Sequence, residues 1–393
     1  MNVVERYLEL ALRLGRHADE LVDAYFGPEE VRARVEAEAV TSPARLADDA
    51  AELRRELDFD DEARQRWLDA QVRALETIAR KLDGGSFAYA EEVELVYGVR
   101  PRWYDETEFE QAHALLDEAL PGSGTVAYRY ARWLDETAIP VDKLGAALES
   151  VTEELRARTR ELVGLPEGEE VEIELVENRR WSGFAHALGD LRGRVLVNTD
   201  LPFLAFGLSH FLTHEIYPGH HTEQAWKEAV LVQERGFLEQ TIGVLWAPHA
   251  VVSEGIAELA EEILLGDDGQ QLTSEHLRRL GIAYDPEIGS RVSEARRTLG
   301  SRVMSNLGLL KHERGAADDE LLDYARRWSL QPEDRVKKMI ASLEERVSPG
   351  YVVCYPEGYR LARGFVRGDV ERFKQLLVEQ LTPADLETAE VRD

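Results

Sequence analysis

One segment, residues 209–221, constrains the fold and chemistry of this chain more than any other. It holds four of the ten histidines, and a Pro-Gly pair interrupts what the surrounding apolar residues predict to be a single buried helix. Imidazole nitrogens bind divalent metals, and an acidic residue beside the first of these ligands can take a proton from metal-bound water. The residues concerned are His210, His214, Glu215, His220 and His221.

The spacing of these histidines departs from the short zinc-peptidase signature H-E-x-x-H, whose two ligands lie at i and i+4 on one helix face. On an unbroken helix His220, at i+6 from His214, would lie about 120° away, whereas His221 at i+7 would return to within about 20°. In a second geometry the residues before His220 loop out, and His220 takes the i+4 role. We favour the second geometry, because Pro218 and Gly219 disfavour a continuous helix. His221 remains the alternate ligand.

A third ligand is expected, since catalytic zinc is usually held by three protein groups. The best candidate is Glu254, in the predicted helix that contains Ser253-Glu254-Gly255. Glu254, Glu258 and Glu261 share one helix face, and three like charges repel unless a cation or an arginine lies among them. A solvated acidic face is the alternative. Glu258 is expected to be solvated or paired with an arginine, and Glu261 is a weaker candidate for a carboxylate that orients a histidine.

Together these motifs resemble a known family. His-Glu-x-x-Pro-Gly-His-His followed by Ser-Glu-Gly-x-Ala-x-x-Ala-Glu resembles the bacterial family called domain of unknown function 885, which is placed among the thermolysin-like (gluzincin) zinc metallopeptidases and is similar to the carboxypeptidase Taq type. Pro349-Gly350-Tyr351 and the residues up to Gly358 resemble its Pro-Gly-Gln-x-x-x-Tyr-x-x-Gly element, and 194–199 resembles the strand before its metal helix. The resemblance covers roughly residues 170–365.

The resemblance implies a set of roles. His214, His220 and Glu254 would be metal ligands, Glu215 the general base, and Tyr355 a hydrogen-bond donor to the reacting carbonyl oxygen. The chain departs from the family pattern at Tyr351, where glutamine is usual, and at Ile256, where tryptophan is frequent. These departures leave the metal site intact but put substrate preference in doubt.

Several further residues are weaker candidates for the site. Tyr359 is a second phenol that could stabilise the oxyanion, and Asn198 either contacts substrate or ends a strand. An arginine could bind a substrate carboxylate through two hydrogen bonds. The arginines near the tyrosine element are Arg346, Arg360 and Arg363, and Arg363 is the one we carry forward.

The amino-acid composition argues against two classes of binding partner. The net charge of −29 argues against nucleic acid and against an anionic membrane surface, because both need a basic footprint. Cys354 is the single cysteine and is expected to be a small buried hydrophobe. The N-terminus reads as an amphipathic helix and not a signal peptide, and no apolar run approaches the roughly 20 residues that cross a bilayer. We expect a soluble cytoplasmic protein of open oligomeric state, with which a homodimer is compatible.

Hydrophobic periodicity predicts a mainly α fold. Helices are expected over 1–17, 44–58, 61–82, 107–119, 124–136 and 142–163, and after residue 200 to the end; strands are expected over 170–176 and 194–198, joined by a turn at 189–193. The predicted architecture is a large helical body with a deep cleft and a small sheet beside the metal helix, as in zincins. Residues 1–166 would form one wall and 167–393 the catalytic region (sheet 170–199, metal helices 203–265, then C-terminal helices), with one continuous domain as the alternative.

The function expected from these features is metal-dependent hydrolysis of the amide bonds of small peptides, by a carboxypeptidase or an oligopeptidase. One divalent ion, Zn²⁺ by default and Co²⁺ or Mn²⁺ otherwise, would activate a water molecule for Glu215 to deprotonate. The alternatives are a metal-dependent hydrolase of a non-peptide amide or ester, and an inactive metal-binding scaffold.

Overall fold

The computed structural model describes residues 2–179, 183–343 and 349–391 and has a mainly α fold. The helices of its first half are α1 (Val3–Gly15), α2 (Glu29–Ala37), α3 (Pro43–Glu56), α4 (Glu62–Leu82), α5 (Tyr89–Tyr97), α6 (Glu106–Ala119), α7 (Val126–Glu136) and α8 (Val141–Leu162). Those of its second half are α9 (Leu208–Glu215), α10 (His220–Lys227), α11 (Pro248–Leu265), α12 (Gly269–Arg279), α13 (Pro286–Arg297), α14 (Val303–His312), α15 (Asp318–Ser329), α16 (Glu333–Ser342), α17 (Cys354–Val366), α18 (Val370–Val378) and α19 (Pro383–Val391).

The helices begin where the sequence supplies caps. The side chain of Asn2 accepts a hydrogen bond from the backbone N–H of Glu5 at the start of α1, and that of Asp61 accepts from Ala63 and Arg64 at the start of α4. Such caps satisfy backbone N–H groups that have no partner within the helix. The helices predicted in the first half are confirmed, with ends that differ by a few residues. Among the described residues, no helix is both long and apolar enough to cross a membrane.

Three small sheets accompany the helices. The largest joins β3 (Glu170–Val176), β5 (Arg192–Asn198) and β4 (Gly183–Gly189) in the spatial order β3-β5-β4. β5 pairs in parallel with β3 and antiparallel with β4, so that Val195 lies opposite both Ile173 and Ala185. The shorter strands form two pairs, β1 (Val22–Tyr25) with β7 (Ile242–Val244) and β2 (Ala138–Ile139) with β6 (Phe203–Leu204).

The order of strands in the three-stranded sheet shows that one prediction, the connection between the two expected strands, is wrong. The turn expected at 189–193 was to join the two predicted strands, but β4 lies between them in the chain, and the turn joins β4 to β5 instead. β4 was missed because its sequence, GFAHALG, begins and ends with glycine and lacks a clear polar–apolar alternation. β4 contacts α9 and α10, so the missed strand packs against the two helices that carry the histidine segment.

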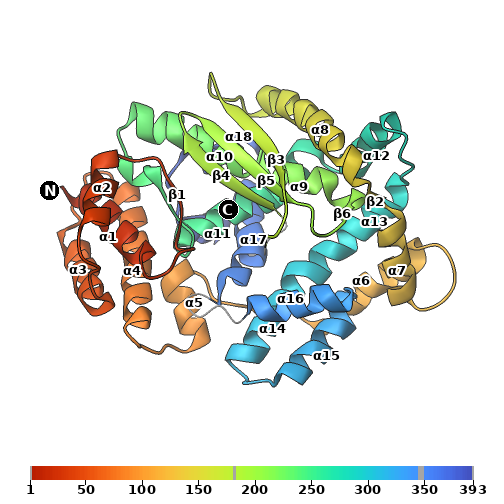
Figure 1. The fold of residues 1–393 in the computed structure, drawn as a ribbon, viewed down its shortest axis with the longest axis horizontal. Coiled ribbons are helices and arrows are strands. Elements are labelled where there is room, and N and C mark those ends of the chain that lie inside the picture. The colour runs from red at the N-terminus through yellow and green to blue at the C-terminus, as the bar shows by residue number, and fades with distance from the viewer. Residues whose placement is uncertain (1, 180–182, 344–348, 392–393) are drawn as a thin grey trace.

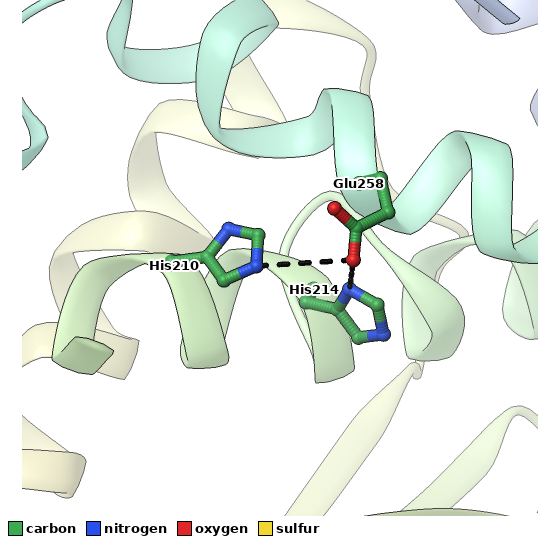
Figure 2. Close-up of side chains that lie close together, drawn as sticks. All are labelled: His210, His214 and Glu258. Carbon is green, nitrogen blue, oxygen red and sulfur yellow. Dashed lines mark ion pairs between the residues drawn. The ribbon is translucent and has the colours of Figure 1, made fainter. Parts of the chain in front are cut away.

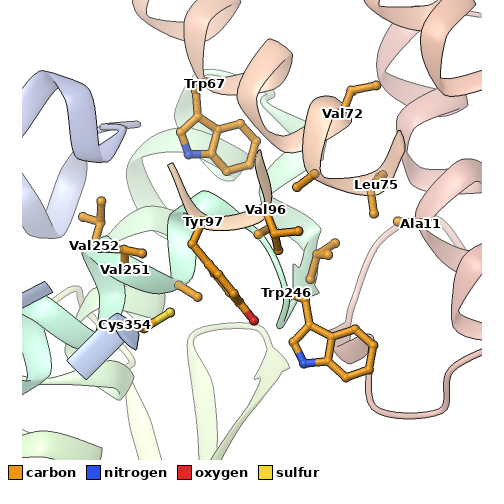
Figure 3. Close-up of a cluster of buried hydrophobic side chains, with 14 of the residues drawn as sticks. Ala11, Trp67, Val72, Leu75, Val96, Tyr97, Trp246, Val251, Val252 and Cys354 are labelled. Atoms are coloured by element: carbon orange, nitrogen blue, oxygen red, sulfur yellow. The ribbon is translucent and has the colours of Figure 1, made fainter. Parts of the chain in front are cut away.

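Figure 1 shows α1–α4 grouped at one side and α6, α7 and α12 at the other, with α11 and α17 between them. Three hydrophobic clusters hold these helices together, and each combines residues from both sides of the boundary predicted at residue 166. Figure 3 shows the largest cluster, in which Trp67 of α4 and Tyr97 of α5 lie near Val251 of α11 and Cys354 of α17. Cys354 is a buried free thiol, as expected.

Helices α11 and α17 pack closely against each other in the core. A Cβ atom added at Gly255 of α11 would lie 2.4 Å from the carbonyl oxygen of Gly358 on α17, and one added at Gly358 would lie 2.4 Å from the carbonyl oxygen of Val251. Two facing glycines thus allow backbone to meet backbone. This crossing brings the tyrosine element of 351–358 against the helix that carries Glu254.

We predict that Gly358→Ala lowers the free energy of unfolding by about 1–3 kcal/mol, because the added methyl group overpacks a contact between two rigid backbones. Gly145→Ala is the matched control: Gly145 lies inside α8 with no atom within 4 Å of its added Cβ, so alanine should stabilise by roughly 0.5–1 kcal/mol. Urea denaturation followed by circular dichroism measures both. Equal stability of Gly358→Ala and the wild type would contradict the close crossing.

Candidate metal centre

The helix break predicted at Pro218-Gly219 is present. α9 ends at Glu215, α10 begins at His220, and the peptide bond between Tyr217 and Pro218 is cis. Gly219 passes so close to the end of α9 that a Cβ atom there would lie 1.8 Å from the carbonyl oxygen of His214. Only glycine permits this approach, and the interrupted geometry is therefore the one that the chain adopts.

The break brings three side chains together. The Nε2 atom of His214 lies 3.4 Å from Oε2 of Glu254, and Nε2 of His220 lies 3.8 Å from the same oxygen. The two imidazole rings are perpendicular, with centroids 4.8 Å apart. The three candidate ligand atoms all lie within 4.8 Å of one another. We call His214, His220 and Glu254 the inner trio.

The inner trio fits a divalent cation. Nitrogen and oxygen ligands lie about 2.1 Å from zinc, so two ligands of a tetrahedral ion lie about 3.4 Å apart. Burial lowers the pKa of His214 to about 4 and also lowers the pKa of His220, so both rings are neutral at pH 7 and have a free lone pair. Oε2 of Glu254 is buried without a hydrogen-bond partner among the described residues. An unpartnered carboxylate oxygen facing two neutral rings is costly unless a cation joins them.

A second group, His210, His214 and Glu258, adjoins the inner trio (Figure 2). Oε1 of Glu258 lies 3.6 Å from Nδ1 of His214 and 4.0 Å from Nε2 of His210, while Nδ1 of His210 lies 3.5 Å from Oε2 of Glu261. Burial alone would lower the pKa of His210, but Glu261 and Glu258 outweigh it and raise that pKa to about 9. A protonated ring has no lone pair for a metal, so this group suits a cation less well.

The second group changes two expectations. Glu258 was expected to be solvated or paired with an arginine, but it faces two histidines because α11 packs against α9. Its oxygen lies 3.6 Å from Nδ1 of His214, on the side of the ring from which a carboxylate that hydrogen-bonded Nδ1 would leave Nε2 for a metal. Glu261 accepts a hydrogen bond from Ser209 at 2.6 Å and lies beside His210, so it orients that histidine and neither histidine of the inner trio.

Two tyrosines of the C-terminal element reach the inner trio. The hydroxyl of Tyr351 donates to Oε1 of Glu254 at 2.6 Å. The ring of Tyr355 lies nearly parallel to that of His214, with centroids 6.4 Å apart. Sequence reasoning missed the role of Tyr351 and noted it only as a departure from a pattern that has glutamine. The available signal was that glutamine and tyrosine are both hydrogen-bond donors.

Glu215, the expected general base, is the last residue of α9 and follows His214 directly. Burial, and to a lesser extent the charge of Glu254, raise the pKa of Glu215 to about 8. A cation bound by the inner trio would act in the opposite direction, because a nearby positive charge favours the ionised carboxylate.

The alternate ligand, His221, lies away from the inner trio. Its Nε2 atom lies 3.1 Å from Oε2 of Glu169, which also accepts a hydrogen bond from the hydroxyl of Tyr217 at 2.7 Å. Arg156 donates from Nε to the other oxygen of Glu169 at 2.8 Å. Glu169, Tyr217 and His221 are all at most 2% exposed. This buried cluster holds both flanks of the loop that leads into His220.

The weaker candidates lie outside the inner trio. Tyr359 donates to Glu262 at 2.8 Å and Arg363 pairs with the same carboxylate, which lies two helical turns, or about 12 Å, along α11 from Glu254. Asn198 hydrogen-bonds the carbonyl of Arg179 and the N–H of Asp200, as a residue that ends a strand does. Arg360 pairs with Glu357. Arg346 lies outside the described residues.

Comparisons with known proteins give a fold and no function. No family model and no curated protein matches the chain. A crystal structure described as "the putative lipoprotein from Colwellia psychrerythraea" is similar with a TM-score of 0.54 and 16% identity, covering 92% of this chain and 69% of that one. A second, "a putative lipoprotein of unknown function from Shewanella oneidensis", has a TM-score of 0.48 and 14% identity over 93% of this chain and 69% of that one.

These findings correct the family assignment made from the motifs. The resemblance to domain of unknown function 885 and to thermolysin-like metallopeptidases is not supported, because no family model matches the chain and the similar structure from Colwellia psychrerythraea is described only as a putative lipoprotein. A local motif of eight residues can recur without common descent, whereas a family model weighs the whole chain. The cytoplasmic location expected from the sequence stays a prediction, as does the zincin-like cleft.

We predict that Glu169→Gln lowers the free energy of unfolding by about 2–3 kcal/mol at pH 7, because three side chains lose a charged partner. Burial alone would raise the pKa of Glu169, but hydrogen bonds from His221, Tyr217 and Arg156 outweigh it and hold that pKa below its ordinary value. The stabilisation is thus present above the unfolded-state pKa of about 4.3 and is lost as the pH falls below it.

The difference between wild type and Glu169→Gln should therefore shrink between pH 5 and pH 3, measured by urea denaturation at each pH. Glu170→Gln, which changes the exposed neighbour, is the control and should have little effect at any pH. A difference that persists undiminished at pH 3 would show that the Glu169 carboxylate is not the source of the stabilisation.

Proposed function

We propose that this protein is a metal-dependent hydrolase that cleaves amide bonds, with one divalent cation, zinc by preference, held by His214, His220 and Glu254. The observation that carries the proposal is the buried Oε2 of Glu254, which has no hydrogen-bond partner in the described part of the chain and faces the Nε2 atoms of two neutral histidines. Two histidines and one glutamate form a common catalytic zinc set, which leaves a coordination position for water or substrate. The same nitrogen and oxygen ligands could also bind Co²⁺ or Mn²⁺.

The residues around the inner trio supply the remaining chemistry. When bound, the cation would polarise the substrate carbonyl and make water a stronger acid. Glu215, adjacent to His214, accepts the proton of the attacking water and delivers it to the leaving amine. Tyr355, whose ring lies against His214, donates a hydrogen bond to the developing oxyanion. One such donor lowers the activation barrier by about 3–4 kcal/mol.

A peptide is the substrate class that we favour. β4 is the last strand in the order β3-β5-β4 and contacts α9 and α10 as well as β1. The backbone of an edge strand can pair with an extended peptide, which would hold the peptide beside the inner trio. This arrangement supports a peptide over an amide that lacks a backbone to pair.

We predict that Glu215→Gln keeps the metal and lowers kcat by about 10²- to 10⁴-fold, because glutamine cannot accept the proton. The assay incubates zinc-loaded protein with a defined peptide library and detects products by mass spectrometry. Glu262→Gln is the matched control, since Glu262 lies on α11 but contacts Tyr359 and Arg363 instead of the inner trio. Wild-type turnover in Glu215→Gln would remove Glu215 as the base.

The two tyrosines one turn apart on α17 make a second test. We predict that Tyr355→Phe lowers kcat by about 10²- to 10³-fold with little change in KM, as expected for a donor that acts only in the transition state. Tyr359→Phe should leave both constants near the wild type, because that hydroxyl is engaged by Glu262. Equal losses in the two variants would contradict the assignment.

A further inference from the structure

A line of polar contacts leads from His220 away from the inner trio. Nδ1 of His220 lies 3.0 Å from Oγ of Ser253, which directly precedes Glu254 on α11. The hydroxyl of Ser253 donates a short hydrogen bond to Oε2 of Glu223. Lys227 donates a second short hydrogen bond to Oε1 of the same carboxylate. Glu223 is 4% exposed, so little solvent competes for these contacts.

The number of protons that these groups carry determines which group donates and which accepts in each hydrogen bond. A serine hydroxyl has one proton, an ionised glutamate only accepts, and a lysine ammonium only donates. With its carboxylate between Lys227 and Ser253, Glu223 accepts the hydrogen bond that the Ser253 hydroxyl donates. The Ser253 oxygen then offers only lone pairs to His220, and Nδ1 of His220 must be the ring nitrogen that carries hydrogen.

The opposite arrangement is unfavourable. If Nδ1 of His220 were the bare nitrogen, Ser253 would have to donate its proton to the ring, and its lone pairs would face Oε2 of Glu223 at hydrogen-bond distance. Two acceptors would then oppose each other in a buried position. A neutral histidine side chain in water favours hydrogen on Nε2, so the contacts around His220 reverse the ordinary preference.

We propose that Ser253, with Glu223 and Lys227, is a positioning device that keeps the ring hydrogen of neutral His220 on Nδ1, where Ser253 accepts it, and so leaves the lone pair of Nε2 directed at Oε2 of Glu254. The inference rests on the proposed function, because the free Nε2 matters only if the inner trio binds a cation. In a metal site the hydrogen bond made by the distal ring nitrogen fixes the tautomer and raises the metal affinity. Ser253 is thus distinct from the ligands and acts through His220.

The direct test is the tautomer of His220 in metal-free protein labelled with ¹⁵N-histidine. A long-range ¹H–¹⁵N correlation spectrum at pH 8 separates the two tautomers, and His220→Asn identifies the His220 signals by their loss. We expect hydrogen on Nδ1 in the wild type and a majority with hydrogen on Nε2 in Ser253→Ala. Ser253→Thr, which keeps the hydroxyl, should restore the wild-type tautomer. Hydrogen on Nε2 in the wild type, or no change in Ser253→Ala, would overturn the proposal.

Zinc affinity, measured by competition with a chromogenic chelator, is the second readout. Ser253→Ala should bind zinc about 10- to 100-fold more weakly, and Ser253→Thr should bind nearly as the wild type does. Ser305→Ala is the control, since Ser305 is a fully buried serine whose hydroxyl donates to the carbonyl of Arg102 and not to this line. Thermal melting by circular dichroism checks that each variant is folded.

The two readouts separate the proposals. If the tautomers are as expected but no variant binds zinc, the proposed function fails and the assignment of the His220 tautomer to Ser253 stands. If Ser253→Ala changes the tautomer and keeps wild-type zinc affinity, the positioning role is overturned while the metal centre stands.

Discussion

The candidate site depends on one steric constraint, the contact between Gly219 and the last turn of α9. A side chain at this position would collide with the carbonyl oxygens of Thr213 and His214. Because the chain can pass there, it starts α10 beside the end of α9, and His220 lies against His214 instead of beyond it. The buried cluster around Glu169 holds the loop on its other side, through Tyr217 and His221. The candidate centre is thus built by tertiary packing of two short helices, α9 and α10, against α11, which carries Glu254.

Each member of the inner trio has one polar atom directed outward and one directed inward. Two of the outward atoms have hydrogen-bond partners, since Tyr351 donates to Oε1 of Glu254 and Ser253 contacts Nδ1 of His220. The third, Nδ1 of His214, faces Oε1 of Glu258 at 3.6 Å, which is beyond hydrogen-bond distance. The inward atoms face one another, with Nε2 of both histidines directed at Oε2 of Glu254. Partners that orient ligands while leaving their inner lone pairs free are characteristic of preorganised metal sites. The net charge of −29 adds a long-range field that attracts cations.

The sequence contained enough information for the local geometry and too little for its surroundings. Pro218 and Gly219 predict the helix break because their backbone restrictions act locally, and the amphipathic helices and β3 follow from periodicity. β4 could not be predicted, since glycine at both ends weakens the strand pattern and its place depends on pairing with β5. Tyr351 and Glu258 were missed because their roles depend on how α17 and α9 pack against α11, which no spacing rule encodes. The motif resemblance failed as a family assignment for the same reason, since a short motif reports local geometry alone.

The central claim is that His214, His220 and Glu254 hold a divalent cation. Its most direct test is zinc content by elemental mass spectrometry after loading and desalting, for the wild type and for His214→Ala, His220→Ala, Glu254→Ala and His221→Asn. The account predicts about one zinc per chain in the wild type and in His221→Asn, and a sharp loss in the other three variants. Absence of zinc from the wild type, or its loss with His221→Asn while His220→Ala keeps it, would contradict the account.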